Sequence, residues 1–477
     1  MSKKVCITKT VAIIAAFTMV AGVSASCFGN DGKIHIKLGM WPENTSTQDV
    51  AMFNLWKTLF EEENPQYVID PSHYTYNPTT IGTDAQARTL PTVFETWFTE
   101  PEMLISRRVI RDITPQLDAK GWSSKMDEGM KEIVSDDNGR IYGIPRDGYG
   151  LGMALNLAVL YDYGIIEKNE STGNYILHDT NGNPLYPTSF SDISDMADVF
   201  SGYDNAPKGL ITLTANKTGG WQFSNIAWNF GAKLQVKGAD GKWKANLNDP
   251  KAIEALQWIN QMNIDEKLTR GTTIGYQDWQ TELSSGRVAA AFVGNDALQL
   301  AITNGGMALK DLAFVPMPKG PRGDQKALFG GTPFVFSSEA TDEQVEGTFK
   351  FLEYMGRCPD ITDISLQGLE DGNATAVAKG IPVIPIIKPW TNPEYVNAVN
   401  TVEAKYSGNI NMDYYKDFYA LFENMKTGEE PLKTQEMYAI LDQVLQDVMN
   451  PKTNSNCTSL LTTANATFQK VLDDAQK

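Results

Sequence analysis

The chain has few of the residue types on which metal and catalytic centres depend. It contains four cysteines and only three histidines, His35, His73 and His178, among 477 residues. It has no CxxC pair, no Cys/His spacing of a metal site, no P-loop, no nucleophile elbow and no glycine-rich dinucleotide fingerprint. We therefore expect no catalytic residues, no metal and no cofactor.

Positive charge is also scarce. The sequence has 41 lysines and arginines against 58 aspartates and glutamates, which gives a formal net charge of −17. A chain this acidic is repelled by nucleic-acid phosphates and by anionic lipid headgroups. We expect neither nucleic acid nor an anionic membrane surface as an electrostatic partner.

Long apolar runs are confined to the amino terminus. Lysines within the first nine residues precede an uncharged apolar stretch at 11–23, and Cys27 follows small residues. The apolar part is shorter than the roughly 20 residues that a membrane span needs. We predict that residues 1–26 are a lipoprotein signal peptide and that Cys27 is the lipid anchor, although Ser24 departs from the usual aliphatic residue there. A plain secretory signal cleaved near Ala25 and a retained membrane helix are the alternatives.

Two cysteines remain after the signal and the anchor. Cys358 and Cys457 could pair in an oxidising exterior, or they could be two separate free thiols. The sequence leaves this choice open.

The length exceeds what one hydrophobic core usually supports, so we expect two or more domains. Apolar residues alternate at 34–38, as in a half-buried strand, and a helical spacing follows at 49–63. Strand patterns return at 67–70 and 90–94. This alternation predicts an α/β lobe with a largely parallel sheet.

The middle third has a different pattern. Turn signals within 174–186 and 236–243 predict two small hairpins, and Asp249 followed by proline predicts the start of a helix. The apolar run at 288–293 predicts a buried strand, through which we expect the chain to return to the first lobe. The spacing at 434–449 predicts another amphipathic helix.

The most informative segment is 139–156, Gly-Arg-Ile-Tyr-Gly-Ile-Pro-Arg-Asp-Gly-Tyr-Gly-Leu-Gly-Met-Ala-Leu-Asn. Its glycines allow backbone geometry that other residues resist, and Pro145 fixes one φ angle among them. We interpret the segment as a crossing between two lobes.

This segment resembles the stretch that runs through the domain junction in extracellular solute-binding proteins of sugar ABC importers. Asn156 stands at that family's asparagine position, while Leu155 replaces the usual tyrosine. The amino-terminal signal and the later blocks at 283–292, 315–321 and 330–331 follow in the family's order. The chain is identified as a member of the sugar-type (family 1) solute-binding proteins, in the Gram-positive lipoprotein form.

The resemblance implies a two-lobed α/β fold of the type II periplasmic-binding-protein kind. It implies a ligand in the cleft between the lobes, closure about hinge crossings, and delivery of the ligand to an ABC permease at the outer face of the cell membrane. We expect a monomer whose N-terminal lobe comprises 27–145 and 287–331 and whose C-terminal lobe comprises 146–286 and 332–477.

A sugar site needs carboxylates and amides for hydroxyls, and exposed aromatic rings for the C–H faces of the sugar. Glu43 and Glu100 follow strand ends, where open α/β sheets place ligands. Arg146 and Asp147 could bind sugar oxygens, and Arg146 would suit a uronate, or the two could form a structural salt bridge between the lobes. The predicted ligand-binding residues are Trp41, Glu43, Trp97, Glu100, Arg146, Asp147, Tyr149, Trp221, Trp228, Asn295, Asp296 and Trp390.

Each of these residues also has a plain structural interpretation, as a surface carboxylate, a turn residue or a core aromatic. At the level of function, the alternatives are a binding protein for a non-sugar solute, such as a peptide or polyamine, and a surface-anchored carbohydrate-active enzyme. Such an enzyme would need an acid and a base held a fixed distance apart. The sequence does not decide which sugar is bound, how long it is, or whether it is acidic.

Overall fold

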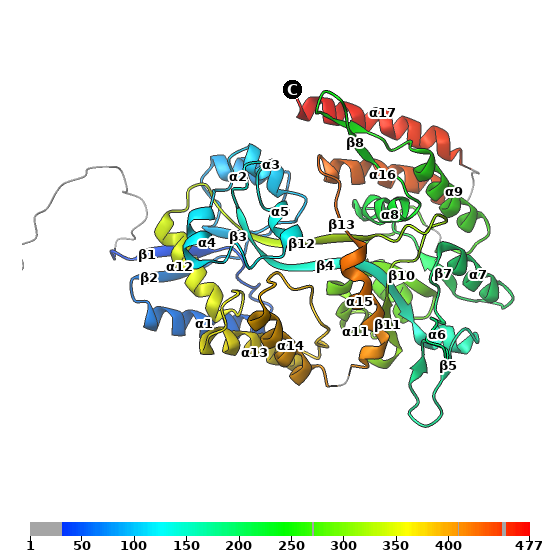
Figure 1. Ribbon diagram of the computed structural model, residues 1–477, viewed down its shortest axis with the longest axis horizontal. Coiled ribbons are helices and arrows are strands. Elements are labelled where there is room, and N and C mark those ends of the chain that lie inside the picture. The colour runs from blue at the N-terminus through cyan, green and yellow to red at the C-terminus, as the bar shows by residue number, and fades with distance from the viewer. Residues whose placement is uncertain (1–30, 270, 409, 451–454) are drawn as a thin grey trace, which may run out of the picture.

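The computed structural model describes residues 31–269, 271–408, 410–450 and 455–477 (Figure 1). The predicted signal peptide and Cys27 lie outside the described residues. No helix in the described part is long and apolar enough to cross a membrane.

The first strands and helix form as the sequence predicts. β1 (Ile34–Leu38), β2 (Tyr67–Pro71) and β3 (Val93–Glu95) lie parallel in one sheet. The apolar positions of β1 are the buried ones, because successive side chains of a strand point to opposite faces. α1 (Thr47–Glu63) buries Trp56 and packs against this part of the sheet.

One long strand, β4 (Gly143–Asn156), links the two halves of the molecule. Its first part pairs with β12 (Ala327–Phe336), and its second part pairs with β10 (Val288–Gly294) and β11 (Leu312–Val315). The strand order is β2-β1-β3-β12-β4-β10-β7, with β7 at Lys208–Ile211. Figure 1 shows β4 and β12 running side by side from one half into the other. The segment predicted as a crossing is therefore an extended strand.

Two large cores lie on the two sides of this crossing. The first core surrounds β1 and α1 and includes Trp122 and Trp390. The second core surrounds β7 and β10 and includes many residues of the carboxyl-terminal helices. Cys358 lies in the first core and Cys457 in the second, and both are buried free thiols.

The later segments are distributed between the halves differently from the predicted ranges. β10 and β11 were expected in the first lobe, but they pair with the second part of β4 and lie in the second core. α12 (Asp342–Tyr354) was expected in the second lobe, but it packs against β1 and α1. An all-apolar strand such as Val288–Gly294 fits the centre of either sheet region, so its sequence could not decide its neighbours. We infer that the lobe boundaries lie inside β4 and β12.

Several helix ends follow their local signals. Asp249 caps α9 (Pro250–Ile264) by accepting from the Lys251 amide, with proline in the first turn. Thr341 and Gln344 form a capping box at the start of α12.

The predicted hairpin near residue 240 is present as β8 (Gln235–Lys237) and β9 (Trp243–Ala245). The earlier one is smaller than predicted, with only a His178–Pro184 bridge across the turn, while β6 (Tyr175–Ile176) pairs with β5 (Glu167–Lys168).

The remaining elements complete the layers around the sheet (Figure 1). They are α2 (Ile81–Gln86), α3 (Pro101–Ser106), α4 (Thr114–Lys120), α5 (Glu128–Ile133), α6 (Leu157–Asp162), α7 (Phe190–Ser201), α8 (Thr218–Asn229), α10 (Asp278–Ser284), α11 (Gln299–Thr303), α13 (Asp363–Ala378), α14 (Pro393–Tyr406), α15 (Lys416–Met425), β13 (Lys426–Gly428), α16 (Thr434–Met449) and α17 (Cys457–Ala475). α16 matches its predicted range.

Candidate ligand-binding site

A bulge in β4 positions the first polar pair of the site. Thr332 of β12 pairs with Asp147 and Pro333 pairs with Pro145, so Arg146 is an extra residue in β4. A bulge bends the strand and re-aims the side chain of the extra residue. Arg146 Nε here donates to Asp147 Oδ2 over 2.7 Å, so these neighbouring side chains contact each other.

Arg146 also binds a carboxylate of β3. Its Nη1 donates to Glu95 Oε1 over 2.7 Å. One guanidinium therefore holds two carboxylates, Glu95 and Asp147, in a charge-assisted network. Because the guanidinium of Arg146 already binds these two carboxylates, its positive charge is not free to receive an acidic ligand.

The glycines of β4 serve close packing. A Cβ atom at Gly148 would lie 2.5 Å from Met130 Cε, and one at Gly150 would lie 2.0 Å from Phe422 Cε2. Neither glycine has a positive φ angle. The prediction of unusual backbone geometry holds at Gly139, with a φ angle of 76°, and is wrong for Gly148 and Gly150, which let α5 and α15 approach the strand.

Tyr149 belongs to the opposite side of β4, because side chains alternate along a strand. Its ring packs over Gly330, where a Cβ atom would lie 2.3 Å from the Tyr149 hydroxyl oxygen. It is tilted against Trp221, with ring centroids 6.3 Å apart, and Trp221 in turn meets Tyr276 edge-on at 5.8 Å. Three half-buried rings thus gather from β4, α8 and the segment before α10.

Trp221 is held by the close contact of α8 with α16. A Cβ atom at Gly220 would lie 2.3 Å from the Tyr438 carbonyl oxygen, so only glycine allows this approach. The Asp442 carboxylate of α16 accepts from the amides of Lys217 and Gly220, at 2.5 and 2.8 Å. The Gly219-Gly220 pair therefore fixes the helix start that presents Trp221.

Asp296 follows the end of β10 and lies near the same rings. Its side chain is exposed at the surface of the site, but protein atoms crowd around the carboxyl group closely enough to desolvate it in part. This desolvation, followed by the negative charge of Asp147, raises the pKa of Asp296 to about 7, against the opposing effect of Arg146. Burial, followed by the charge of Asp296, also raises the pKa of Tyr276.

Glu429 adds a second carboxyl group with a raised pKa. It follows β13 and accepts from the Tyr438 hydroxyl over 2.8 Å. Burial raises the pKa of Glu429 to about 7, and the charge of Glu100 acts in the same direction. Burial and then the charges of Glu429 and Asp296 raise the pKa of Tyr149 well above its usual range. Glu429 therefore belongs to the same polar cluster.

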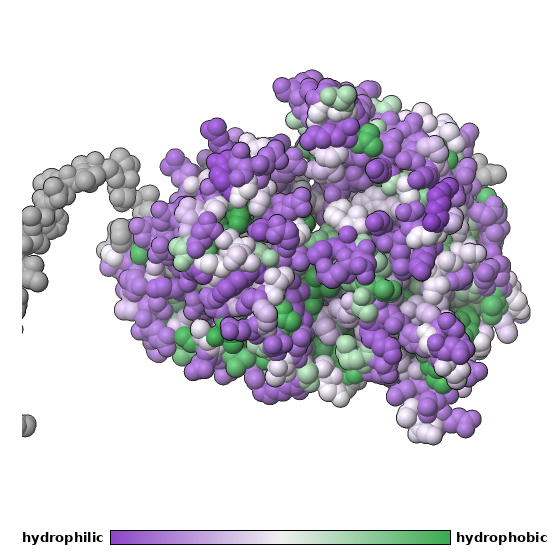
Figure 2. Space-filling view, viewed as in Figure 1, coloured by the Kyte–Doolittle hydropathy of each residue, from purple (hydrophilic) through white to green (hydrophobic). Residues whose placement is uncertain are grey.

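We call this cluster the junction site, because it lies where β4 passes from one half to the other. Its residues are Arg146, Asp147, Tyr149, Trp221, Tyr276, Asp296 and Glu429. The space-filling view shows the surface hollowed between the two halves (Figure 2).

The segment 97–100 reaches across to the second half. Trp97 is 42% exposed and meets Tyr76 edge-on, with centroids 5.3 Å apart. Glu100 is buried and accepts hydrogen bonds from the hydroxyls of Tyr76 and Thr99. Gln435 of α16 donates to Thr99 Oγ1 over 3.2 Å. The segment thus forms a direct polar contact between the halves, with Trp97 left free to meet a ligand.

Two predicted tryptophans are core residues instead of cleft residues. Trp390 was expected at the cleft rim because prolines flank it, but it is fully buried and meets Trp122 edge-on at 5.8 Å. Trp41 is 6% exposed and packs edge-on against Phe53 at 5.3 Å. Neither ring offers a free face to a sugar in this structure.

Three further predicted residues lie apart from the cluster or are engaged within the protein. Trp228 is buried and donates from Nε1 to Glu430 over 2.9 Å. Asn295 is buried and accepts from the Gly150 amide over 2.9 Å, which ties β10 to β4. Glu43 lies at the surface, 3.4 Å from the His73 ring.

Two members of the junction site were not among the residues predicted from the sequence. Tyr276 and Glu429 stand in connecting segments without a recognised motif, and only tertiary packing brings them to β4. Glu95 ends a predicted strand and could have been selected by the same rule as Glu100.

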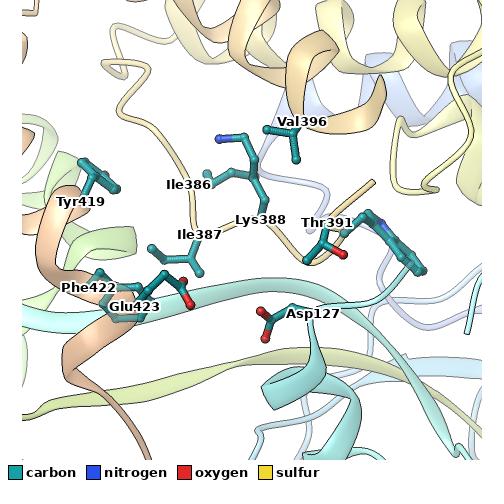
Figure 3. A pocket seen from close by; sticks show the side chains of 10 residues that line it. Asp127, Ile386, Ile387, Lys388, Thr391, Val396, Tyr419, Phe422 and Glu423 are labelled. Atoms are coloured by element: carbon teal, nitrogen blue, oxygen red, sulfur yellow. The ribbon is translucent and has the colours of Figure 1, made fainter. Parts of the chain in front are cut away.

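Two cavities adjoin the crossing. One of about 330 Å³ lies between Asp127 at the start of α5, the segment 386–391 and α15 (Figure 3). Beside it, Lys426 Nζ lies 3.0 Å from Asp127 Oδ2, which links the two halves. A larger cavity, of about 430 Å³, opens next to Glu95 and Arg146.

The sequence matches a model of a protein family described as bacterial extracellular solute-binding protein, over residues 56–367. The chain belongs to this family. No curated protein matches its sequence. The match to the family model confirms the predicted family of extracellular solute-binding proteins, and the lipoprotein form stays a prediction.

Solved structures of solute-binding proteins share the fold. An ABC substrate-binding protein of Listeria monocytogenes in complex with cycloalternan is 13% identical, with a TM-score of 0.65 over 89% of this chain and 96% of that one. The GacH receptor of Streptomyces glaucescens, studied with acarbose, is 15% identical, with a TM-score of 0.64 over 92% and 98%. UgpB of Mycobacterium tuberculosis, in complex with glycerophosphocholine, is 14% identical, with a TM-score of 0.65 over 93% and 99%. The predicted two-lobed α/β fold is confirmed.

Proposed function

We propose that this protein is the solute-binding component of an ABC importer and that it holds a carbohydrate, most simply an oligosaccharide, at the junction site. The observation that carries the proposal is the gathering of three half-buried rings near the carboxyl group of Asp296, which in turn lies close enough to Asp147 to feel its charge. Flat rings pack against the C–H faces of a sugar, and carboxylates accept from its hydroxyls. Residues from both halves take part, so a bound sugar would bridge them.

The charges at the site favour a neutral or amine-bearing sugar over an acidic one. Arg146 is already shared by Glu95 and Asp147, and Asp296 and Glu429 add further carboxyl groups. A uronate would meet more negative than positive charge there, at short range and with little screening. This argues against the expectation that Arg146 would suit a uronate.

Closure of the two halves about β4 and β12 would follow ligand binding, as in other hinge-bending proteins. The Gln435–Thr99 contact is one of those that such a closure would strengthen. Anchoring through Cys27 at the outer face of the membrane, action as a monomer, and delivery to a permease complete the proposal.

A cationic non-sugar solute such as a polyamine is the second candidate. The excess of carboxyl groups at the junction site favours it, and so do the rings, since aromatic faces attract ammonium groups. We prefer a sugar because the rings of Trp221 and Tyr276, which meet edge-on, lie beside the exposed carboxyl group of Asp296. This combination matches the apolar C–H faces and the hydroxyl groups that alternate around a sugar ring.

Isothermal titration calorimetry of the mature chain tests these assignments. The panel comprises neutral, amine-bearing and uronate oligosaccharides together with spermidine. We expect micromolar or tighter binding of a neutral or amine-bearing sugar, without product formation, and at least tenfold weaker binding of the matched uronate. Binding of spermidine alone would support the second candidate, and release of sugar products would show an enzyme.

A further inference from the structure

The cavity of about 430 Å³ beside Arg146 has features of a separate binding site. It lies in the half that carries β1, between α1, α13, α14 and the segment 382–386. Its volume falls within the range of small-molecule sites. We call it the Arg357 cavity, after the one arginine in its lining that lacks a carboxylate partner.

The Arg357 cavity has an apolar part and a polar part, and the apolar part is the slightly larger of the two. Its apolar lining includes Met52 and Phe53 of α1 and Val399 of α14, together with Val383 and Ile384. The apolar part can bind a hydrocarbon group, because each Å² of apolar surface removed from water contributes about 25 cal/mol of favourable free energy.

Two glycines of α13 line the cavity, and one of them leaves space open. Gly368 and Gly372 lie one turn apart in the lining, so both belong to the same face of the helix. A Cβ atom at Gly372 would meet nothing within 4 Å, whereas one at Gly368 would lie 2.2 Å from the Tyr354 carbonyl oxygen. Gly372 therefore borders free space, and a larger side chain there would enter it.

Arg357 supplies a positive charge that no neighbouring acid takes up directly. Among the described residues it forms no ion pair, and its hydrogen bond is a long one, 3.5 Å from Nη1 to the Arg146 carbonyl oxygen. The two acids of the lining have other partners. Glu95 binds Arg146, and Glu403 lies 3.4 Å from Lys388 Nζ and accepts from the Ile386 amide over 3.1 Å.

A guanidinium beside apolar walls is stabilised when a carboxylate binds it, because its fork of N–H donors matches two carboxylate oxygens. We propose that the Arg357 cavity binds a small carboxylate that carries an apolar group, with the carboxylate on Arg357 and the apolar group between α1 and α14. This occupant has the opposite charge preference from the ligand of the junction site. The Glu95–Arg146 pair is the wall that the two sites share.

Calorimetric titration of the mature chain with phenylacetate and with its neutral isostere phenylacetamide tests the proposal. Phenylacetate is expected to bind with a dissociation constant below about 1 mM, and phenylacetamide at least tenfold more weakly. Arg357→Met should remove this preference for the carboxylate. Arg88→Met is the matched control, since Arg88 is an exposed arginine, 3.7 Å from Glu339, and its loss should change neither affinity.

Gly372→Leu supplies a second variant that keeps every charge. The leucine side chain should fill the cavity and abolish phenylacetate binding, while the melting temperature stays at or above that of the unchanged chain. Binding of any sugar at the junction site should persist in both variants. Trp221→Ala should in turn leave phenylacetate binding intact, which separates this proposal from the proposed function.

The proposal is overturned if phenylacetate does not bind at about 10 mM, or if phenylacetamide binds equally well. It is also overturned if Gly372→Leu binds phenylacetate as the unchanged chain does. If Arg357→Met lowers the melting temperature markedly, its loss of binding could reflect partial unfolding. The phenylacetate binding of Gly372→Leu then decides whether the cavity is the binding site.

Discussion

The two sides of β4 perform different tasks. One side carries Gly148 and Gly150, whose missing side chains let Met130 and Phe422 pack against the backbone. The other side carries Tyr149, which meets Trp221 in the junction site. One strand thus separates packing from binding by the alternation of its side chains. Changes on the glycine side should affect stability, and changes on the other side should affect ligand affinity.

The largest expected effect is on the glycine side. Gly150→Val should lower the free energy of unfolding by about 3 kcal/mol, because even its Cβ atom would overlap the Phe422 ring. Chemical denaturation measures this loss, and affinity for the sugar should change less than threefold in the folded fraction.

A glycine in open space provides the matched control for Gly150. Gly372→Ala should raise the free energy of unfolding by about 0.5–1 kcal/mol, because alanine is the better helix former and nothing obstructs it. If Gly150→Val were as stable as the unchanged chain, the packing role assigned to this side of β4 would be wrong.

On the binding side, the largest effect is expected at Trp221. Trp221→Ala should weaken sugar binding by about tenfold or more, since it removes the central ring of the aromatic group. Titration calorimetry measures the change. The control is Trp228→Phe, at a buried tryptophan of the same helix, which should leave the affinity for the sugar unchanged. If both variants lost the same affinity, Trp221 would affect binding only by stabilising α8 and would not contact the sugar.

A carboxylate of the site should contribute less than the ring. Asp296→Asn keeps the size of the side chain and removes its charge, so we expect about threefold to tenfold weaker binding of a neutral sugar. The same variant should narrow the difference between neutral and uronate ligands, because it removes a charge that repels the uronate. Competition titrations of the two ligands measure this, and an unchanged ratio would argue against the charge-based selectivity.

The smallest effect is on the pH dependence of stability. Desolvation raises the pKa of both Asp296 and Glu429 to about 7, so between about pH 4 and 7 the folded chain holds protons that the unfolded chain has lost. The stability that these two groups contribute is therefore present at low pH and declines as pH rises through 7. Melting temperatures at pH 5.5 and 8 should show the decline.

A double variant isolates this pH effect. Asp296→Asn with Glu429→Gln should flatten the slope between pH 5.5 and 8. His35 contributes a slope of the same sign, because the hydrogen bond that its ring donates to the Asp70 carboxylate raises the pKa of His35. The difference in slope between the variant and the unchanged chain is therefore the informative quantity. An unchanged slope would mean that both carboxyl groups are ordinary surface acids.

The sequence predicted the elements whose signals are local. The alternation at β1, the cap at Asp249 and the spacing of α16 each depend on a few neighbouring residues, and each appears in the structure. The assignment of β10 to the first lobe was wrong, because an all-apolar strand carries no information about which strand it will pair with.

Site residues could be selected from the sequence where a local signal marked them: the recognised segment for three of them, a helix start for Trp221 and a strand end for Asp296. Arg146, Asp147 and Tyr149 come from one recognised segment, and the structure places them together. Tyr276 reaches them through tertiary contacts that no local pattern specifies. Trp390 shows the opposite error, since flanking prolines suggested an exposed loop while the ring is packed against Trp122.

A crystal structure of the mature chain with the tightest neutral or amine-bearing sugar from the titrations would test the central claim most directly. We predict a sugar ring against Trp221, a sugar hydroxyl within hydrogen-bond distance of Asp296, and contacts from both halves of the molecule. A sugar bound elsewhere, with Trp221 and Asp296 untouched, would contradict the assignment of the junction site.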